Sequence, residues 1–111
     1  MDPVSFYKCL AEPTRLQCLL LIQQLGELCV CELTTATGLS QPKVSRHLAQ
    51  LRECGLLQSS KRGQWVFYRL AGSLPGWAGK VLAETQTGNA LWLREPLARL
   101  HKMADRPSCC G

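Results

Sequence analysis

Cysteines carry the most evident chemistry in this sequence. The 111-residue chain contains seven of them, and Cys29 and Cys31 stand two residues apart at the start of a short predicted helix. In a reducing compartment, such cysteines are more often buried small residues, metal ligands or redox thiols than disulfides. An odd number also fits poorly with a fully paired disulfide framework. The positive end of a helix dipole favours the thiolate, which is the form that a soft, thiophilic ion requires.

The spacing of this pair predicts how an ion would act on the chain. We expect the helix to run from about Cys29 to Thr37 and to end at Gly38. In a regular helix, residues two apart differ by about 200°, so the two sulfurs would point to opposite sides. One ion held by both would therefore unwind the start of the helix. Two buried structural cysteines would give the same pattern.

The next segment predicts a helix suited to the major groove of DNA. Val44, Leu48 and Leu51 recur at i, i+4 and i+7 and define a buried stripe. Polar residues cluster in the N-terminal half, where the helix dipole favours a phosphate, and Arg46 could contact guanine or phosphate. His47 lies near the buried stripe and is expected to pack rather than read bases. A solvated face of an unrelated helical domain is the alternative. The residues expected to contact DNA are Ser40, Gln41, Lys43, Ser45 and Arg46.

A β-hairpin is expected after this helix. Residues 56–61 and 65–70 read as two strands joined around a glycine, with a basic and polar tip. That tip lies where a wing would reach the neighbouring groove or backbone. Its expected DNA contacts are Lys61, Arg62 and Gln64.

The remaining segments predict helices. Phe6 and Tyr7 belong to a short opening helix, a buried helix runs from Pro13 to Leu25, and a last helix carries Trp77 and Trp92. Gly88 should weaken this last helix, and Pro96 should kink or end it. The apolar face of the last helix is too long for so small a protein to cover, so it is expected to pair with its symmetry mate.

Together these elements give a mainly α (α+β) fold, a winged helix-turn-helix in the order α-α-α-α-β-β-α. We expect a homodimer through the first and last helices, which implies a near-palindromic double-stranded DNA site. Residues 1–104 are expected to form the DNA-binding and dimerisation domain, and residues 105–111 a flexible tail that carries Cys109 and Cys110.

Composition permits this interpretation without requiring it. Lys and Arg number 13 against 8 Asp and Glu, a modest net charge of +5. The N-terminus does not resemble a signal peptide, and the longest apolar stretch, 18–22, is far too short to span a membrane. We therefore expect a soluble, cytoplasmic protein without a membrane partner. The chain contains neither a Cys-X-X-Cys motif nor a Gly-rich phosphate loop or nucleophile signature, so an enzyme is not expected.

Three segments, 27–33, 40–48 and 64–70, resemble the arsenic-responsive repressors of the ArsR/SmtB family. The similarity covers roughly residues 5–80. It implies a homodimeric winged-helix repressor that leaves its operator when a metal or metalloid binds. It also assigns Cys29 and Cys31 to As(III) or Sb(III), and it implies no organic cofactor. Ligation at the helix that positions the reading helix should then weaken DNA binding.

The sequence departs from the family pattern at the third ligand. Well-known arsenic repressors of this group carry a cysteine three residues after the pair, where this chain has Thr34. A hydroxyl is a poor substitute for a thiolate on arsenic. The third ligand is either absent or supplied from elsewhere, by Cys109 or Cys110, or by Cys9 of the opposite subunit. Cys18 is expected to lie in the core, and Cys54, at a helix C-terminus, is not expected to be a ligand.

Two alternatives keep this fold: a Cd, Pb or Zn sensor using the same pair with Cys9, and a repressor switched by cysteine oxidation. A small thiol protein, such as a metal-buffering protein, is a third alternative from a different class.

Overall fold

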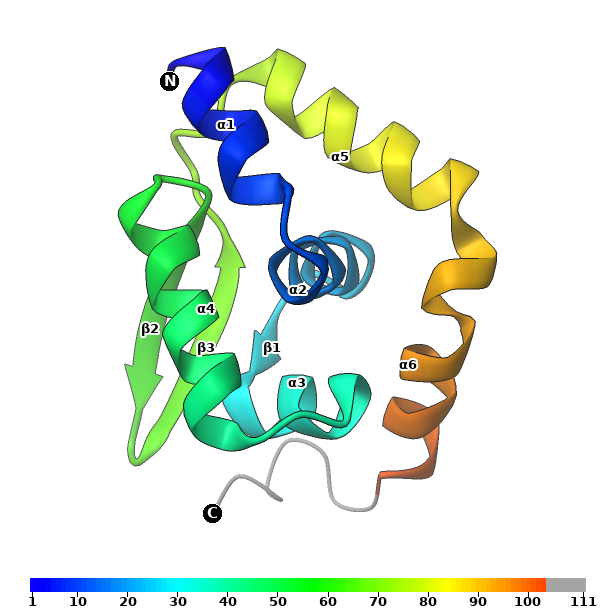
Figure 1. Ribbon diagram of the computed structural model, residues 1–111. Coiled ribbons are helices and arrows are strands. Elements are labelled where there is room, and N and C mark those ends of the chain that lie inside the picture. Colours follow the sequence, from blue (N-terminus) through cyan, green and yellow to red (C-terminus); the bar gives the residue numbers. More distant parts are fainter. Residues whose placement is uncertain (104–111) are drawn as a thin grey trace.

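In the computed structural model, residues 1–103 are described. The expected tail, 105–111, with its candidate ligands Cys109 and Cys110, lies outside them. The first two helices are α1 (Pro3–Leu10) and α2 (Pro13–Leu25). Figure 1 views α2 along its axis, with the other elements placed around it. Residues 18–22 of this helix have no exposed surface, which confirms that it is the buried centre of the fold.

The helix-turn-helix unit consists of α3 (Val30–Thr37) and α4 (Gln41–Glu53). Val44, Leu48 and Leu51 are fully buried, so the stripe expected from their spacing is confirmed. Gly38 ends α3 in the left-handed conformation, with φ of +73°, and lets the chain turn into α4.

The wing is part of a three-stranded antiparallel sheet in the order β1-β3-β2. The hairpin strands β2 (Leu57–Arg62) and β3 (Trp65–Leu70) pair from Arg62↔Trp65 to Leu57↔Leu70, which confirms the expected hairpin. Its tip turns at Gly63, where φ is +64°. The third strand, β1 (Leu28–Cys29), pairs with β3 through Cys29↔Phe67 and was not expected. Two residues are too few to show a strand period.

Two helices end the described chain where one was expected: α5 (Gly76–Gly88) and α6 (Ala90–Lys102). The break lies at Asn89, with φ of −129° and ψ of 39°, directly after Gly88, the residue expected to weaken the helix. Pro96 was expected to kink or end the last helix, yet α6 continues through it. Burial of Leu93 and Leu100 contributes roughly 3–6 kcal/mol, which offsets the cost of an internal proline, about 3 kcal/mol.

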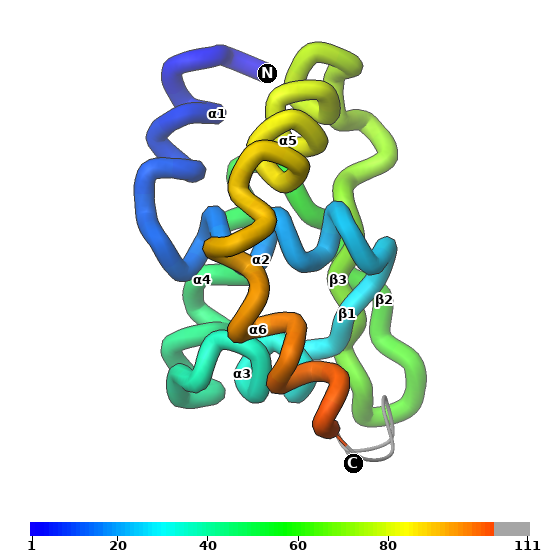
Figure 2. The backbone as a smooth tube through the Cα atoms, turned by 90° about the vertical axis from the view of Figure 1, so that its right-hand side faces the viewer, coloured from blue at the N-terminus to red at the C-terminus, as the bar shows by residue number. Residues whose placement is uncertain are grey.

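The position of α6 matters for the site. Figure 2 shows this helix passing across α3, and the two helices are in contact. The Arg99 Nη1 donates a hydrogen bond to the Ala36 carbonyl at the end of α3, across 2.8 Å. The C-terminal helix is thus fixed to the helix that follows Cys29.

Candidate nucleic-acid interface and cysteine site

The outward face of α4 is polar and ordered. Lys43 and Arg46 are exposed, and Ser45 is half-buried. The Gln41 Nε2 donates a hydrogen bond to the Ser45 Oγ across 2.8 Å, one turn further along the helix. Ser40, the N-cap, is exposed and its side chain caps no backbone N–H. This face therefore carries two hydroxyls, an amide and two cations, with the apolar stripe on the opposite side.

His47 belongs to the packing rather than to this face. It is 9 % exposed, and its Nδ1 lies 3.7 Å from the Glu12 Oε2. The expectation that it packs is confirmed.

The two cations of the wing, Lys61 and Arg62, differ in their contacts within the chain. Lys61, Arg62 and Gln64 are all exposed at the hairpin tip. The Arg62 guanidinium, however, forms an ion pair with Glu27 and lies 3.9 Å from the centre of the Phe67 ring. Its charge is therefore already partly neutralised within the chain. The sequence does not reveal this contact because Arg62 and Glu27 are 35 residues apart.

The cysteine pair lies where the sheet meets α3. Cys29 is the last residue of β1 and the N-cap of α3, with φ of −89° and ψ of 165°, and it is fully buried. Its backbone N–H donates to the Glu32 Oε1 across 2.9 Å. Cys31 is half-buried on the first turn of α3. The helix expected from about Cys29 begins at Val30, because pairing with Phe67 keeps Cys29 extended.

The extended conformation of Cys29 changes the expected effect of an ion on the helix. The backbone of Cys29 is already extended, so an ion held by both sulfurs acts at a strand-to-helix junction rather than in the middle of a regular turn. Thr34, at the position of the family's third cysteine, donates its Oγ1 to the Val30 carbonyl across 2.9 Å. Within residues 1–103, His, Cys, Asp and Glu form no group of three that could hold a metal ion.

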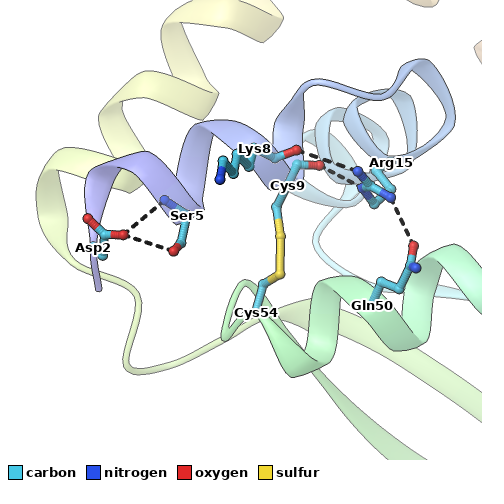
Figure 3. Close-up of a disulfide and its surroundings, with 7 residues drawn as sticks. All are labelled: Asp2, Ser5, Lys8, Cys9, Arg15, Gln50 and Cys54. Carbon is cyan, nitrogen blue, oxygen red and sulfur yellow. Dashed lines mark hydrogen bonds between the residues drawn. A yellow bond between two sulfur atoms is a disulfide. The ribbon is translucent and has the colours of Figure 1, made fainter.

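Two further cysteines form a disulfide that the sequence did not predict. Cys9 of α1 and Cys54, the C-cap of α4, are bonded across a sequence separation of 45 residues (Figure 3). Neither spacing nor composition could pair them, because the contact depends on how α1 lies over α4. Cys18 is fully buried, as expected, and desolvation, with a smaller contribution from Glu12, raises the pKa of its thiol to about 12.

An apolar surface remains on α1 and α5. Val4 and Tyr7 of α1 are more than half exposed, and Trp77 of α5 is 40 % exposed. The Phe6 and Trp77 rings meet edge to face with centroids 5.0 Å apart, which joins α1 to α5. Beside them, a cavity of about 400 Å³ is lined by Pro3, Val4, Tyr7, Lys8 and Ala11.

Comparison with known proteins identifies the family. Residues 12–59 match the model of the bacterial regulatory protein, arsR family. The arsenic resistance transcriptional regulator ArsR1 of Pseudomonas putida is 50 % identical over 107 residues, covering 96 % of this chain and 84 % of that protein. The arsenical resistance operon repressor of Escherichia coli is 56 % identical over 82 residues, covering 74 % of this chain and 70 % of that protein. The chain belongs to the ArsR family.

Solved structures of transcriptional regulators agree with the fold. HlyU from Vibrio cholerae superposes with a TM-score of 0.70 at 33 % identity, covering 78 % of this chain and 90 % of that one. The AntR antimony-specific transcriptional repressor superposes with a TM-score of 0.65 at 28 % identity, covering 76 % and 73 %. The winged helix-turn-helix class expected from the sequence is confirmed, and this ArsR-family chain is a DNA-binding transcriptional regulator rather than an enzyme. Within residues 1–103, every helix is too short or too polar to cross a membrane.

Proposed function

We propose that this ArsR-family protein is a homodimeric repressor that releases a near-palindromic operator when As(III) or Sb(III) binds the thiolates of Cys29 and Cys31. The observation that carries the proposal is the position of Cys29. It is at once a strand residue paired with the wing and the N-cap of the helix that positions α4. The names of the ArsR-family relatives and of the antimony-specific neighbour support the choice of ion.

The binding chemistry needs reduced thiols. Arsenious acid and two thiols give a dithiolate of arsenic with two molecules of water released, so the sulfurs must lie within bonding distance of one atom. Cys29 is fully buried beside Glu32, whereas Cys31 is half-buried on the first turn of the helix. Drawing both sulfurs onto one ion moves the start of α3. Because α3 and α4 pack against each other, α4 shifts with it.

The third ligand belongs to the same proposal. The Thr34 hydroxyl, at the position of the family's third cysteine, donates a hydrogen bond to the Val30 carbonyl. We keep Cys109 and Cys110 as candidates for a third thiolate, although both lie outside the described residues. Cys9 is bonded to Cys54 in this structure and could act as a ligand only after reduction.

DNA binding is assigned to α4 and the wing. Direct contacts to bases or phosphates are proposed for Ser40, Gln41, Lys43, Ser45, Arg46, Lys61, Arg62 and Gln64. The dimer is proposed to form through the apolar surface of α1 and α5, which contains Val4, Tyr7 and Trp77. A two-fold axis through that surface would place two α4 helices in successive major grooves. A repressor of this kind works in the cytoplasm, where bacterial DNA lies.

The deciding experiment measures operator release. Reduced protein is bound to a labelled operator fragment and titrated with arsenite, methylarsenite, antimonite or Cd(II), with fluorescence anisotropy as the readout. We expect release with trivalent arsenic and antimony, and loss of that response in Cys29→Ser and Cys31→Ser. Cys54→Ser is the matched control, and truncation before Cys109 tests the tail.

Two outcomes overturn the proposal. Release by arsenite that persists without both Cys29 and Cys31 removes the pair from the mechanism. Release by Cd(II) alone transfers the protein to the class of divalent metal sensors.

A further inference from the structure

A second pair of cysteines, outside the proposed inducer site, joins α1 to α4. Cys9 lies near the end of α1, a helix that we propose contributes to the dimer surface. Cys54 caps the C-terminus of α4. We propose that Cys9 and Cys54 are a thiol pair that a hydroperoxide oxidises in the folded protein, and that their disulfide makes the operator complex less responsive to inducer. The second half of this proposal rests on the proposed function.

The site is open to a small oxidant. A cavity of about 310 Å³ is bounded by both sulfur residues. Cys54 is exposed, whereas Cys9 is 8 % exposed, so a hydroperoxide reaches Cys54 first. Two cations and one carboxylate, from Lys8, Arg15 and Glu53, line the same cavity.

The chemistry balances without any other reagent. The Cys54 thiolate attacks one peroxide oxygen, an S–O bond forms, the O–O bond breaks, and the leaving oxygen takes a proton as water or an alcohol. The Cys9 thiol then attacks the resulting sulfenic acid, the S–S bond forms, and the hydroxyl leaves as water. Two thiols are oxidised by two electrons in total, and one hydroperoxide is reduced. A thiol reductant reverses the reaction by exchange.

Hydrogen bonds hold the two helices together independently of the sulfur bond. The Arg15 Nε donates to the Cys9 carbonyl across 2.8 Å, and its Nη1 donates to the Gln50 Oε1 of α4 across 2.9 Å (Figure 3). A third bond, from its Nη2 to the Lys8 carbonyl, is longer at 3.5 Å. These contacts are also available to the reduced protein, so its thiols stay close enough to react. Arg15 is therefore a positioning residue for the oxidation.

A disulfide between α1 and α4 should affect the response to inducer. Inducer binding is proposed to move α3 and α4 relative to the dimer surface on α1 and α5. A covalent bond between α1 and the end of α4 opposes that movement. Oxidation should therefore weaken the coupling between inducer and operator.

The test compares full-length wild type with Cys54→Ser after identical treatment with hydrogen peroxide. Peptide mapping should find a Cys9–Cys54 crosslink in the wild type alone. Half-release of operator should then need about five-fold or more arsenite in oxidised wild type than in oxidised Cys54→Ser. A phosphine reductant should abolish the difference, and it is preferred because dithiols bind arsenite. Arg15→Lys should slow crosslinking about ten-fold or more without changing the rate at which iodoacetamide alkylates Cys54.

Each failure has its own meaning. The absence of the crosslink in oxidised wild type overturns the thiol pair, and an equal loss of response in both proteins shows that oxidation acts elsewhere. If reduced wild type ignores arsenite, the proposed function fails and the coupling half fails with it. Peptide mapping still decides whether the two cysteines react.

Discussion

The Glu32 Oε1 accepts a hydrogen bond from the backbone N–H of Cys29 across 2.9 Å. Glu32 is 4 % exposed and Cys29 is fully buried, so this bond closes the N-terminus of α3 away from water. A glutamate three residues after the N-cap commonly returns to the N-cap N–H in this way. The cysteine that we assign to the inducer is thus held by the helix that its ligation would move.

The first prediction concerns this bond. Glu32→Ala leaves a buried N–H without its acceptor and should lower the free energy of unfolding by about 1–3 kcal/mol. Glu32→Gln keeps an acceptor oxygen and should cost less. Urea denaturation of the reduced protein measures both, with the exposed Glu84→Gln as control. Equal stability of all three variants would show that the bond contributes nothing.

The second prediction concerns the outward, polar face of α4, which we propose contacts DNA. Lys43 and Arg46 are exposed on its N-terminal half. If each contacts a phosphate, replacement by alanine should reduce the slope of log affinity against log salt by about 1. If Arg46 instead binds guanine, its replacement should cost about 1–3 kcal/mol on the operator and much less on random DNA. Lys80→Ala, on α5, is the control and should change neither quantity.

The sequence predicted the elements whose signals are local. The stripe of Val44, Leu48 and Leu51 predicted helix α4, because buried residues recur with the helical period. The glycine at position 63 predicted the hairpin because a turn signal between two strand patterns is also local in the sequence. Strand β1 escaped prediction because its evidence is a partner, Phe67, 38 positions further along.

The same limit applies to the site. The position of Cys29 and Cys31 at the start of a helix was predicted from the sequence and is confirmed, with Cys29 as the N-cap. The pairing of Cys9 with Cys54 was not readable, because it depends on tertiary contacts between α1 and α4. The engagement of Arg62 by Glu27 has the same cause. Chemistry within one element can be predicted from spacing, whereas chemistry between elements needs the fold.

The third prediction separates the two wing cations. Arg62 is paired with Glu27 and lies over Phe67, so part of its charge is already compensated. Lys61→Ala should therefore reduce operator affinity and the salt slope more than Arg62→Ala does. Glu27→Gln frees the Arg62 charge and should strengthen binding. Anisotropy at several salt concentrations tests the order, and a larger loss from Arg62→Ala would reverse the assignment.

The fourth prediction uses the buried thiol of Cys18. Burial raises the pKa of this thiol from 9.0 to about 12, so it stays protonated in the folded protein while the unfolded chain ionises above pH 9. Its contribution to stability is thus complete below pH 9 and is lost as the pH rises towards 12. Between pH 8 and pH 10 the loss should be about 1.4 kcal/mol.

The measurement is a difference between two proteins. Unfolding free energies of reduced wild type and Cys18→Ala are compared at both pH values, because lysines and tyrosines titrate equally in the two. The advantage of wild type over the variant should shrink at pH 10. A constant difference would mean that Cys18 ionises as easily in the folded protein as in the unfolded one.

The last prediction concerns the contact between α6 and α3. The Arg99 Nη1 reaches the Ala36 carbonyl at 2.8 Å, and the same guanidinium lies 3.6 Å from the Glu95 carboxylate on its own helix. Arg99→Ala removes the bond to α3 and should cost about 1 kcal/mol of stability. Because α6 then holds the end of α3 less firmly, amide hydrogen exchange should accelerate in both helices while α2 stays protected. The exposed Arg94→Ala, on the same helix, is the control. Unchanged exchange in α3 would show that apolar packing through Leu93 and Leu100 fixes the two helices without this hydrogen bond.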